Sequence, residues 1–140
     1  MQPTLAETIL FVIDANKGLY DKVGKPKVLH SLEVMNQLKY DTEDAQMVGL
    51  LHDVIEDTKV TEDVLRFNGY ESYIIDAVHA LTRKINEPYF EYIQRVKDNH
   101  LAARVKIADA GHNLGRCQDK MDEFGSLAKK YEKVLKELAK

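Results

Sequence analysis

Apolar residues recur at intervals of three or four along most of the chain, which is the spacing of one face of an α-helix. The first such stretch runs from Thr4 to Gly18, and Thr4 and Glu7 have the spacing of a capping box at its start. Similar stretches follow at residues 26–38, 42–58, 61–67, 71–83, 88–96 and 101–114. No alternating pattern of convincing length predicts a strand, so the predicted fold class is all-α.

The C-terminal stretch SLAKKYEKVLKELAK is strongly amphipathic, with lysines on one side. The other side carries the apolar residues Leu127, Tyr131, Val134, Leu135 and Leu138. We predict a helix over about residues 124–139. Such a helix either covers its own core or joins two copies of the chain as a homodimer. The first arrangement is favoured because most amphipathic helices pack on their own domain.

Length and composition fit one domain over residues 1–140, with 44% hydrophobic content. The formal net charge is −3, and lysines and arginines are scattered, unlike the basic stripe of a nucleic-acid binder. Cys117 has no second cysteine for an intramolecular disulfide, and no apolar run is long enough for a membrane span or a signal peptide. We therefore predict a cytoplasmic protein that acts on a small molecule and has neither a nucleic-acid nor a membrane partner.

The stretch GLLHDVIEDT, residues 49–58, places His52, Asp53, Glu56 and Asp57 close together. If the predicted helix continues through it, His52 lies beside Glu56, and Asp53 beside Asp57, on one edge. A solvated helix end is the simplest explanation, but carboxylates at the C-terminal end of a helix oppose its dipole. A divalent cation would remove this repulsion, and imidazole and carboxylate ligands together suit Mn, Fe, Zn, Ni or Co.

Two further residues are candidates to complete a metal site. His30 lies in the apolar context KVLHSLEV, and Asp109 follows the apolar run of VKIADAGHN. Each residue alone is more often structural than a ligand. Together with His52 and Asp53 they form an ordered set, with separations of 22 residues (52 minus 30) and 56 residues (109 minus 53).

This ordered set resembles the H…HD…D signature of the HD-domain metal-dependent phosphohydrolases. HDVIEDT is similar to their HDxxEDT form, and VKIADAGHNL to the VKLADRLHN form of the (p)ppGpp hydrolase domain of RelA/SpoT-type proteins and their small single-domain relatives. The resemblance covers about residues 1–115 and implies a helical HD fold. No stretch after residue 140 would hold a synthetase or regulatory domain, so we expect a stand-alone hydrolase.

The resemblance implies one divalent ion, usually Mn²⁺, with the protein ligands His30, His52, Asp53 and Asp109. It also implies two catalytic carboxylates and one contact to the nucleotide, which are Glu56, Asp57 and Asn113. The neighbouring histidine, His112, is expected to be structural. Three lysines near the expected mouth of the site are candidates to bind phosphates, namely Lys17, Lys22 and Lys25.

The resemblance is weaker in the loop before His30. RelA/SpoT-type enzymes usually carry an arginine–lysine pair there, and the arginine packs on the guanine base, whereas this sequence has Asp21 and Lys22. An aspartate cannot stack on a base as a guanidinium does, and it repels phosphates. We therefore expect weaker or less selective guanine binding, and we expect Asp21→Arg to improve it.

The leading hypothesis for the function is a guanosine 3′,5′-bis(diphosphate) 3′-pyrophosphohydrolase that depends on a metal of the Mn type. The alternative is an HD phosphohydrolase for another nucleotide or for a small phosphate ester. A third hypothesis is a metal-binding module without catalysis. It is disfavoured because such a scaffold has no need for Glu56 and Asp57.

Overall fold

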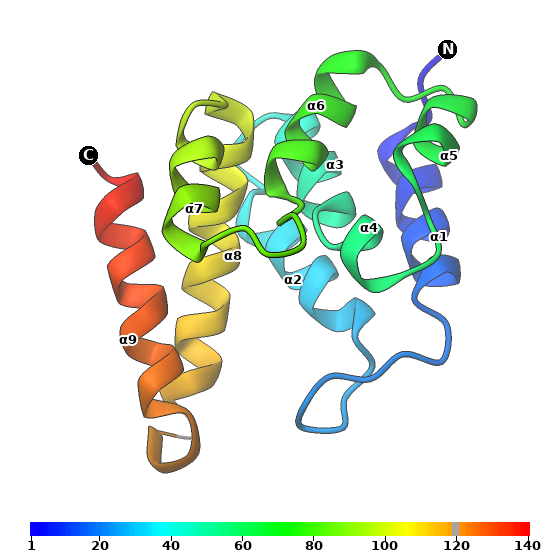
Figure 1. Cartoon of the computed structure of the whole chain (residues 1–140). Helices are drawn as coiled ribbons and strands as arrows, with labels where there is room; N and C mark the ends of the chain where they lie inside the picture. The colour runs from blue at the N-terminus through cyan, green and yellow to red at the C-terminus, as the bar shows by residue number, and fades with distance from the viewer. Residues whose placement is uncertain (119–120) are drawn as a thin grey trace.

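A computed structural model of the chain describes residues 1–118 and 121–140, with the side chains of 117–127 left out. Cys117 and Leu127 therefore lie outside the described side chains. The fold consists of helices joined by loops, the longest of which among the described residues connects α1 and α2 (Figure 1). Within the described residues these are α1 Leu5–Ala15, α2 Val28–Gln37, α3 Glu43–Leu51, α4 Val54–Asp57, α5 Glu62–Phe67, α6 Ser72–Leu81, α7 Tyr89–Lys97, α8 His100–Gln118 and α9 Met121–Leu138. The all-α prediction is confirmed.

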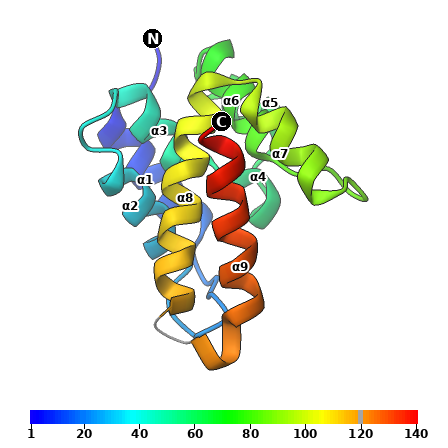
Figure 2. The ribbon, with the colours of Figure 1, turned by 90° about the vertical axis from the view of Figure 1, so that its left-hand side faces the viewer.

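Helix α3 lies at the centre of the fold. It contacts α1, α2, α6 and α8, which surround it in two perpendicular views (Figures 1 and 2). Its buried residues are Ala45, Met47, Val48, Gly49, Leu50 and Leu51. The second half of this helix, from Met47 to Leu51, is buried on all sides and is therefore held by its neighbours rather than by its own propensity. The residue that follows it, His52, therefore has a rigid support.

Side-chain caps define where α1 and α3 begin. At α1 the hydroxyl of Thr4 accepts from the backbone N–H of Glu7 at 3.1 Å, and Glu7 Oε1 accepts from the N–H of Thr4 at 3.0 Å. This reciprocal pair is the predicted capping box. At α3 the cap is Thr42, whose hydroxyl accepts from the N–H of Ala45 at 3.1 Å.

The stretch GLLHDVIEDT is not one continuous helix, which corrects the prediction from the sequence. Helix α3 ends at Leu51, and α4 begins after Asp53, its N-cap. The physical reason is that the ring of His52 hydrogen-bonds the carbonyl of Gly49, and a side chain that bonds the backbone locally competes with the helix. Residues four apart therefore do not form one acidic edge. The carboxylates lie instead at the start of a new helical turn, where backbone N–H groups favour negative charge.

The loop 16–27 between α1 and α2 closes into a hairpin. The backbone N–H of Asp21 donates to the carbonyl of Lys25 at 2.8 Å. Gly24, between them, has a φ of 84°, which glycine adopts without strain. Oδ1 of Asp21 also accepts from the backbone N–H groups of Val23 and Lys25, at 3.0 Å and 2.9 Å. Asp21 is therefore part of the turn itself.

Helix α9 packs along α8 and also contacts α7, and Figure 2 shows α8 and α9 side by side. Ala128 and Val134 of α9 are buried, and Leu135 and Leu138 pack against the core. The apolar side of this helix thus faces its own domain. A homodimer stays a prediction.

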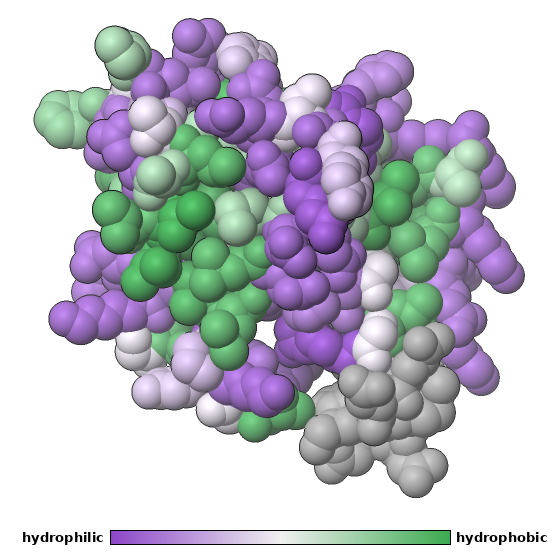
Figure 3. Space-filling model, turned by 180° about the vertical axis from the view of Figure 1, so that it is seen from behind, coloured by the Kyte–Doolittle hydropathy of each residue, from purple (hydrophilic) through white to green (hydrophobic). Residues whose placement is uncertain are grey.

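The surface combines polar and apolar regions. Figure 3 shows apolar side chains gathered on the rear face, on the side where α1 lies, and Leu10 and Ile13 of α1 are exposed. Among the described residues, no helix has both the length and the apolar composition to cross a membrane.

Candidate metal centre

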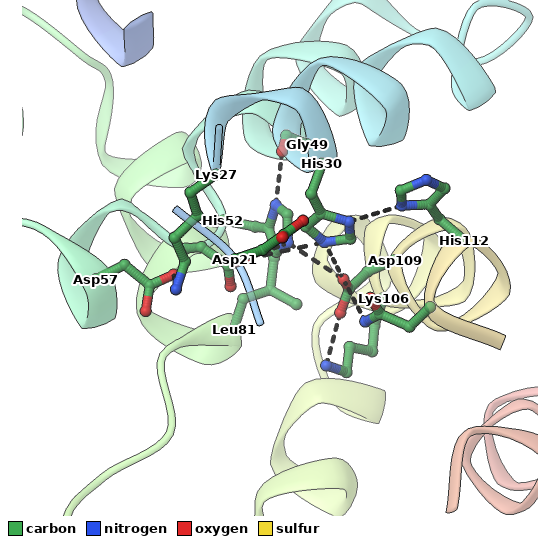
Figure 4. Close-up of polar contacts among 12 residues, drawn as sticks. Asp21, Lys27, His30, Gly49, His52, Asp57, Leu81, Lys106, Asp109 and His112 are labelled. Atoms are coloured by element: carbon green, nitrogen blue, oxygen red, sulfur yellow. Dashed lines mark hydrogen bonds and ion pairs between the residues drawn. The ribbon is translucent and has the colours of Figure 1, made fainter. Parts of the chain in front are cut away.

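Three residues far apart in the sequence bring their side chains together (Figure 4). His30 comes from the first turn of α2, His52 follows α3, and Asp109 comes from α8. Each offers one ligand atom, and these atoms all lie within 4.8 Å of one another. Nε2 of His30 and Nε2 of His52 lie 2.7 Å and 3.3 Å from Oδ1 of Asp109. Imidazole nitrogens and a carboxylate oxygen at this spacing are a suitable ligand set for a divalent metal.

The backbone orients the ring of His52. Its Nδ1 lies 2.6 Å from the carbonyl oxygen of Gly49, and because a carbonyl only accepts, Nδ1 carries the proton. Nε2 then faces the carboxylates of Asp53 and Asp109, at 3.1 Å and 3.3 Å. These oxygens are close but out of line, and Nε2 is buried without a hydrogen-bond partner in the described part of the chain.

A buried nitrogen lone pair facing two carboxylates is unfavourable unless a cation lies among them. The charges of the neighbouring carboxylates also favour a cation at this place. Burial alone would lower the pKa of His52, but the carboxylates of Asp53 and Asp109 raise this pKa well above its ordinary value. The site therefore attracts positive charge to Nε2, and its donor atoms fit a divalent ion.

His112 orients the second histidine. Nδ1 of His30 lies 2.7 Å from Nδ1 of His112, and the two rings stack with their centroids 4.9 Å apart. One nitrogen must donate and the other accept. If Nε2 of His30 binds an ion, then Nδ1 of His30 carries the proton and His112 accepts the hydrogen bond.

Asp53 joins the cluster from the turn after α3. Its Oδ2 lies 3.1 Å from Nε2 of His52 and 3.9 Å from Nε2 of His30. Burial alone would raise the pKa of Asp53, but the nearby charge of His52 brings it below its ordinary value. The fold thus brings together the side chains of all four residues predicted as ligands.

Asp109 is held from two sides. Its Oδ2 accepts from Nζ of Lys106 at 2.8 Å, and its Oδ1 accepts from the amide of Asn113 at 3.1 Å. Burial alone would raise the pKa of Asp109, but Lys106 and His52 hold it well below its ordinary value. The carboxylate is therefore charged, with Oδ1 facing the histidines. Asn113, predicted as a nucleotide contact, here orients the candidate ligand.

The two predicted catalytic carboxylates have different surroundings. Oδ2 of Asp57, which faces a cavity, lies 3.2 Å from Nζ of Lys27. Glu56 has another partner, because its Oε1 accepts from the backbone N–H of Arg83. Reduced solvation raises the pKa of both carboxyls above their ordinary values, and the charge of Asp53 adds to this. A raised carboxyl pKa suits proton transfer near neutral pH.

A cavity of about 780 Å³ opens beside the cluster, and His30, Asp53 and Asp57 are among its lining residues. Of the predicted substrate contacts, Lys22, Lys25 and Asn113 line this cavity, whereas Lys17 does not.

Several polar residues of the site escaped the reasoning from sequence. They are Lys27, Lys106 and Arg116, which contact Asp57, Asp109 and Asp21. Lys27 and Lys106 each lie three residues before a candidate ligand, and Arg116 lies seven residues after one. On a helix this spacing places a residue on the same side as the ligand, so it could have indicated these three residues from the sequence.

The fold and the centre together define a class, that of helical domains whose histidines and aspartates converge on a metal-ion site beside a polar cavity.

No family model matches the chain. Relatives of similar sequence are nevertheless found. The chain is 30% identical over 135 residues to a GTP pyrophosphokinase of Myxococcus xanthus, a match that covers 85% of this chain and 18% of that protein.

The chain is also 33% identical over 114 residues to a guanosine-3′,5′-bis(diphosphate) 3′-pyrophosphohydrolase of Haemophilus influenzae, covering 72% of this chain and 17% of that protein. It thus spans under a fifth of the length of these relatives. A solved structure of a metazoan ortholog of SpoT that hydrolyses ppGpp has the same fold, with a TM-score of 0.70, 21% identity and coverage of 99% of this chain and 96% of that chain. These comparisons confirm the resemblance to the (p)ppGpp hydrolase domain of SpoT/RelA-type proteins.

Proposed function

We propose that this chain is a metal-dependent phosphohydrolase that removes pyrophosphate from the 3′ position of guanosine 3′,5′-bis(diphosphate). The observation that carries the proposal is Nε2 of His52, buried among carboxylates without a hydrogen-bond partner in the residues that the structure describes. The substrate is proposed from the similarity to the Haemophilus influenzae protein, whose name states this activity.

In the proposed site, one ion is held by His30, His52, Asp53 and Asp109. We propose Mn²⁺, because nitrogen and carboxylate oxygen donors suit it and because the resemblance to the HD-domain enzymes implies it. When bound, the ion supplies a Lewis acid that neutralises charge developing on the phosphoryl group and lowers the pKa of a water molecule. The surrounding residues keep the ligands in place, since the second nitrogen of each histidine has its own partner in Gly49 or His112.

Asp57 is the proposed proton acceptor. It faces the cavity, its pKa is raised by reduced solvation, and the ammonium of Lys27 fixes its position. An ionised carboxylate there takes a proton from the attacking water, and the protonated form returns it to the leaving oxygen. Glu56 is the second proposed carboxylate. Its hydrogen bond to the N–H of Arg83 links the site to the segment after α6.

Two lysines are proposed to bind the phosphates. Lys22 and Lys25 line the cavity, and neither ammonium has an ion-pair partner among the described residues. A nucleotide with two diphosphate groups carries a large negative charge, so unpaired cations at the cavity favour its binding.

The test is hydrolysis of guanosine 3′,5′-bis(diphosphate) by the purified chain loaded with Mn²⁺. We expect release of pyrophosphate and guanosine 5′-diphosphate, and we expect EDTA to abolish it. Elemental analysis should find one metal ion per chain in the wild type and a large loss in His52→Ala and Asp109→Ala. His100→Ala, at an exposed histidine outside the cavity lining, is the matched control and should keep both metal and activity.

Other results would redirect the assignment. Turnover of another nucleotide or of a small phosphate ester, with no turnover of the guanosine substrate, would favour the alternative phosphohydrolase. Bound metal without turnover of any phosphate would favour a non-catalytic module. If neither chelator nor added Mn²⁺ changed the melting temperature, the metal site itself would be wrong.

A further inference from the structure

Asp21 and Arg116 meet at the cavity from two different elements, the hairpin loop and helix α8. Nη2 of Arg116 lies 3.5 Å from Oδ2 of Asp21, and both residues line the cavity. A tight charge-assisted hydrogen bond is shorter, at about 2.7–2.9 Å. The pair is therefore loose, and both groups keep hydrogen-bonding capacity for a ligand.

The hairpin fixes the direction of the Asp21 carboxylate. Oδ1 accepts from two backbone N–H groups of the turn, those of Val23 and Lys25. Oδ2 has Arg116 as its one hydrogen-bond partner among the described residues. Asp21 thus presents an acceptor of fixed position next to the guanidinium, which offers donors only.

Arg116 lies on the side of α8 that carries the candidate metal ligand. Asp109 and Arg116 are seven residues apart, which is nearly two helical turns and about 10.5 Å along the axis. Asn113, which lies between them on α8, also lines the cavity. A ligand with its reacting phosphate near Asp109 can therefore extend along α8 to Arg116. In a nucleoside 3′-diphosphate the base lies at the opposite side of the sugar from that phosphate.

Among the charged residues that line the cavity are Asp21, Lys22, Lys25 and Arg116, which differ in their partners. Lys22 and Lys25 form no ion pair among the described residues and attract phosphates, whereas Asp21 and Arg116 form one with each other. A neutral pair gives little attraction for a phosphate, but it places a hydrogen-bond donor beside an acceptor. That pattern suits an uncharged polar group such as a nucleobase.

We propose that Asp21 and Arg116 together recognise the guanine base, in place of the arginine that stacks on it in RelA/SpoT-type enzymes. Arg116 donates to O6 of guanine, and Oδ2 of Asp21 accepts from N1–H. Adenine has the reverse pattern, an amino donor at C6 and an acceptor at N1, so in the same orientation it leaves both protein groups unpaired. The proposal rests on the proposed function for its substrate, and it adds the residues that select the base.

The test compares kcat/KM for guanosine and adenosine 3′,5′-bis(diphosphate) with the chain loaded with Mn²⁺. Asp21→Asn keeps the Oδ1 acceptor that the turn needs but replaces the outer oxygen with a donor. Arg116→Gln removes the guanidinium. We expect the wild type to prefer the guanosine substrate by roughly 5- to 100-fold, the discrimination typical of a paired base contact, and we expect each variant to lose most of this preference.

Two controls separate base selection from other effects. Asp63 and Arg66 form an exposed ion pair on α5, with 3.1 Å between Arg66 Nη1 and Asp63 Oδ1. Asp63→Asn and Arg66→Gln should leave the preference unchanged. Lys25→Met should lower kcat/KM for both substrates to the same extent, because a phosphate contact does not distinguish the bases. Melting temperature and metal content should stay near wild type in Asp21→Asn and Arg116→Gln.

The inference is overturned if the wild type does not prefer guanosine, or if Asp21→Asn and Arg116→Gln keep the full preference. In either case hydrolysis of the guanosine substrate would leave the proposed function intact. A metal-loaded wild type that hydrolyses neither nucleotide would instead overturn the proposed function, and with it this assignment of the base contacts.

Discussion

The ammonium of Lys106 donates a hydrogen bond to Oδ2 of Asp109 at 2.8 Å inside the core, while Oδ1 of the same carboxylate faces His30 and His52. Both partners are nearly buried, with 10% and 5% of their side chains exposed. Burial alone would lower the pKa of Lys106, but Asp109 raises it well above its ordinary value. One carboxylate thus links a buried cation to the candidate metal centre.

Lys106→Met should make stability depend on the metal more strongly. It leaves Asp109 as a buried carboxylate with less positive charge around it, and removing one partner of a buried ion pair typically costs about 3–5 kcal/mol. We expect a loss of this size in urea unfolding with EDTA and a clearly smaller loss with saturating Mn²⁺, because the ion also neutralises Asp109. Lys59→Met, at an exposed lysine, is the control. An equal loss of unfolding free energy with EDTA and with Mn²⁺ would show that no ion binds at Asp109.

The helices could be predicted from the sequence because their apolar periodicity and their caps are local signals. The helix after Thr42 shows the limit of such signals. The apolar pattern continues through Ile55, yet the helix ends at Leu51, because the ring of His52 forms a hydrogen bond with the carbonyl of Gly49. A hydrogen bond between a side chain and the backbone leaves no periodic trace, so the break could not be predicted.

Some residues of the candidate site could likewise be predicted from the sequence, and others could not. His30, His52, Asp53 and Asp109 could be named because they belong to an ordered motif with fixed residue types. The partner of Glu56 could not, since the N–H of Arg83 lies 27 residues away and carries no side-chain signal. The same is true of Asp21, whose carboxylate bonds the turn and Arg116. Such roles depend on tertiary contacts that only the fold supplies.

Glu56→Gln and Asp57→Asn should separate metal binding from chemistry. Each change keeps size and polarity but removes a proton acceptor, so metal content should stay near wild type while turnover falls about 100-fold or more. We expect the larger loss in Asp57→Asn, because Asp57 lines the cavity and Glu56 does not. The measurement is kcat alongside elemental analysis of each variant. Loss of the metal in both variants would mean that these residues are ligands.

Gly49→Ala should disturb the centre from a distance. An added Cβ would lie 3.0 Å from Cδ1 of Leu38 and 3.3 Å from Cγ1 of Val34, at the contact between α3 and α2. Because His30 lies on α2 and His52 follows α3, separating these helices moves the two candidate ligands apart. We expect a loss of about 1–3 kcal/mol in unfolding free energy, as overpacking usually costs, and weaker metal binding by titration.

Gly115→Ala is the matched control for this change. It is also a glycine within a helix, but an added Cβ there meets nothing within 4 Å. Alanine favours helix over glycine by about 1 kcal/mol, so this variant should be neutral or more stable. If Gly49→Ala behaved like Gly115→Ala, close packing of α2 on α3 would not be what sets the histidine spacing.

Glu87 should give the stability a dependence on acid pH. Arg95 donates to both of its carboxylate oxygens, at 2.9 Å and 3.0 Å, and these bonds, together with one from the backbone N–H of Lys84, lower the pKa of Glu87 from 4.5 to about 2. Because the folded pKa lies below the unfolded value, the contribution is complete above about pH 4.5 and is lost as the pH falls towards 2. Glu87→Gln should therefore lower the melting temperature at pH 7, and the deficit should shrink by pH 3. Glu91→Gln, at an exposed glutamate on α7, should show neither effect.

Asp21→Arg is the variant for which the structure reverses the expectation from the sequence. From the sequence alone, an arginine in the loop should restore guanine binding. In the fold, Oδ1 of Asp21 holds the N–H groups of Val23 and Lys25, and Oδ2 faces Arg116. An arginine loses these bonds and places two like charges together, so we expect a lower melting temperature and a higher KM for the guanosine substrate. Asp21→Asn, which keeps the turn, should retain the wild-type melting temperature. A lower KM in Asp21→Arg, specific to the guanosine substrate, would mean that a residue of the loop stacks on the base. Arg116 would then not recognise the base.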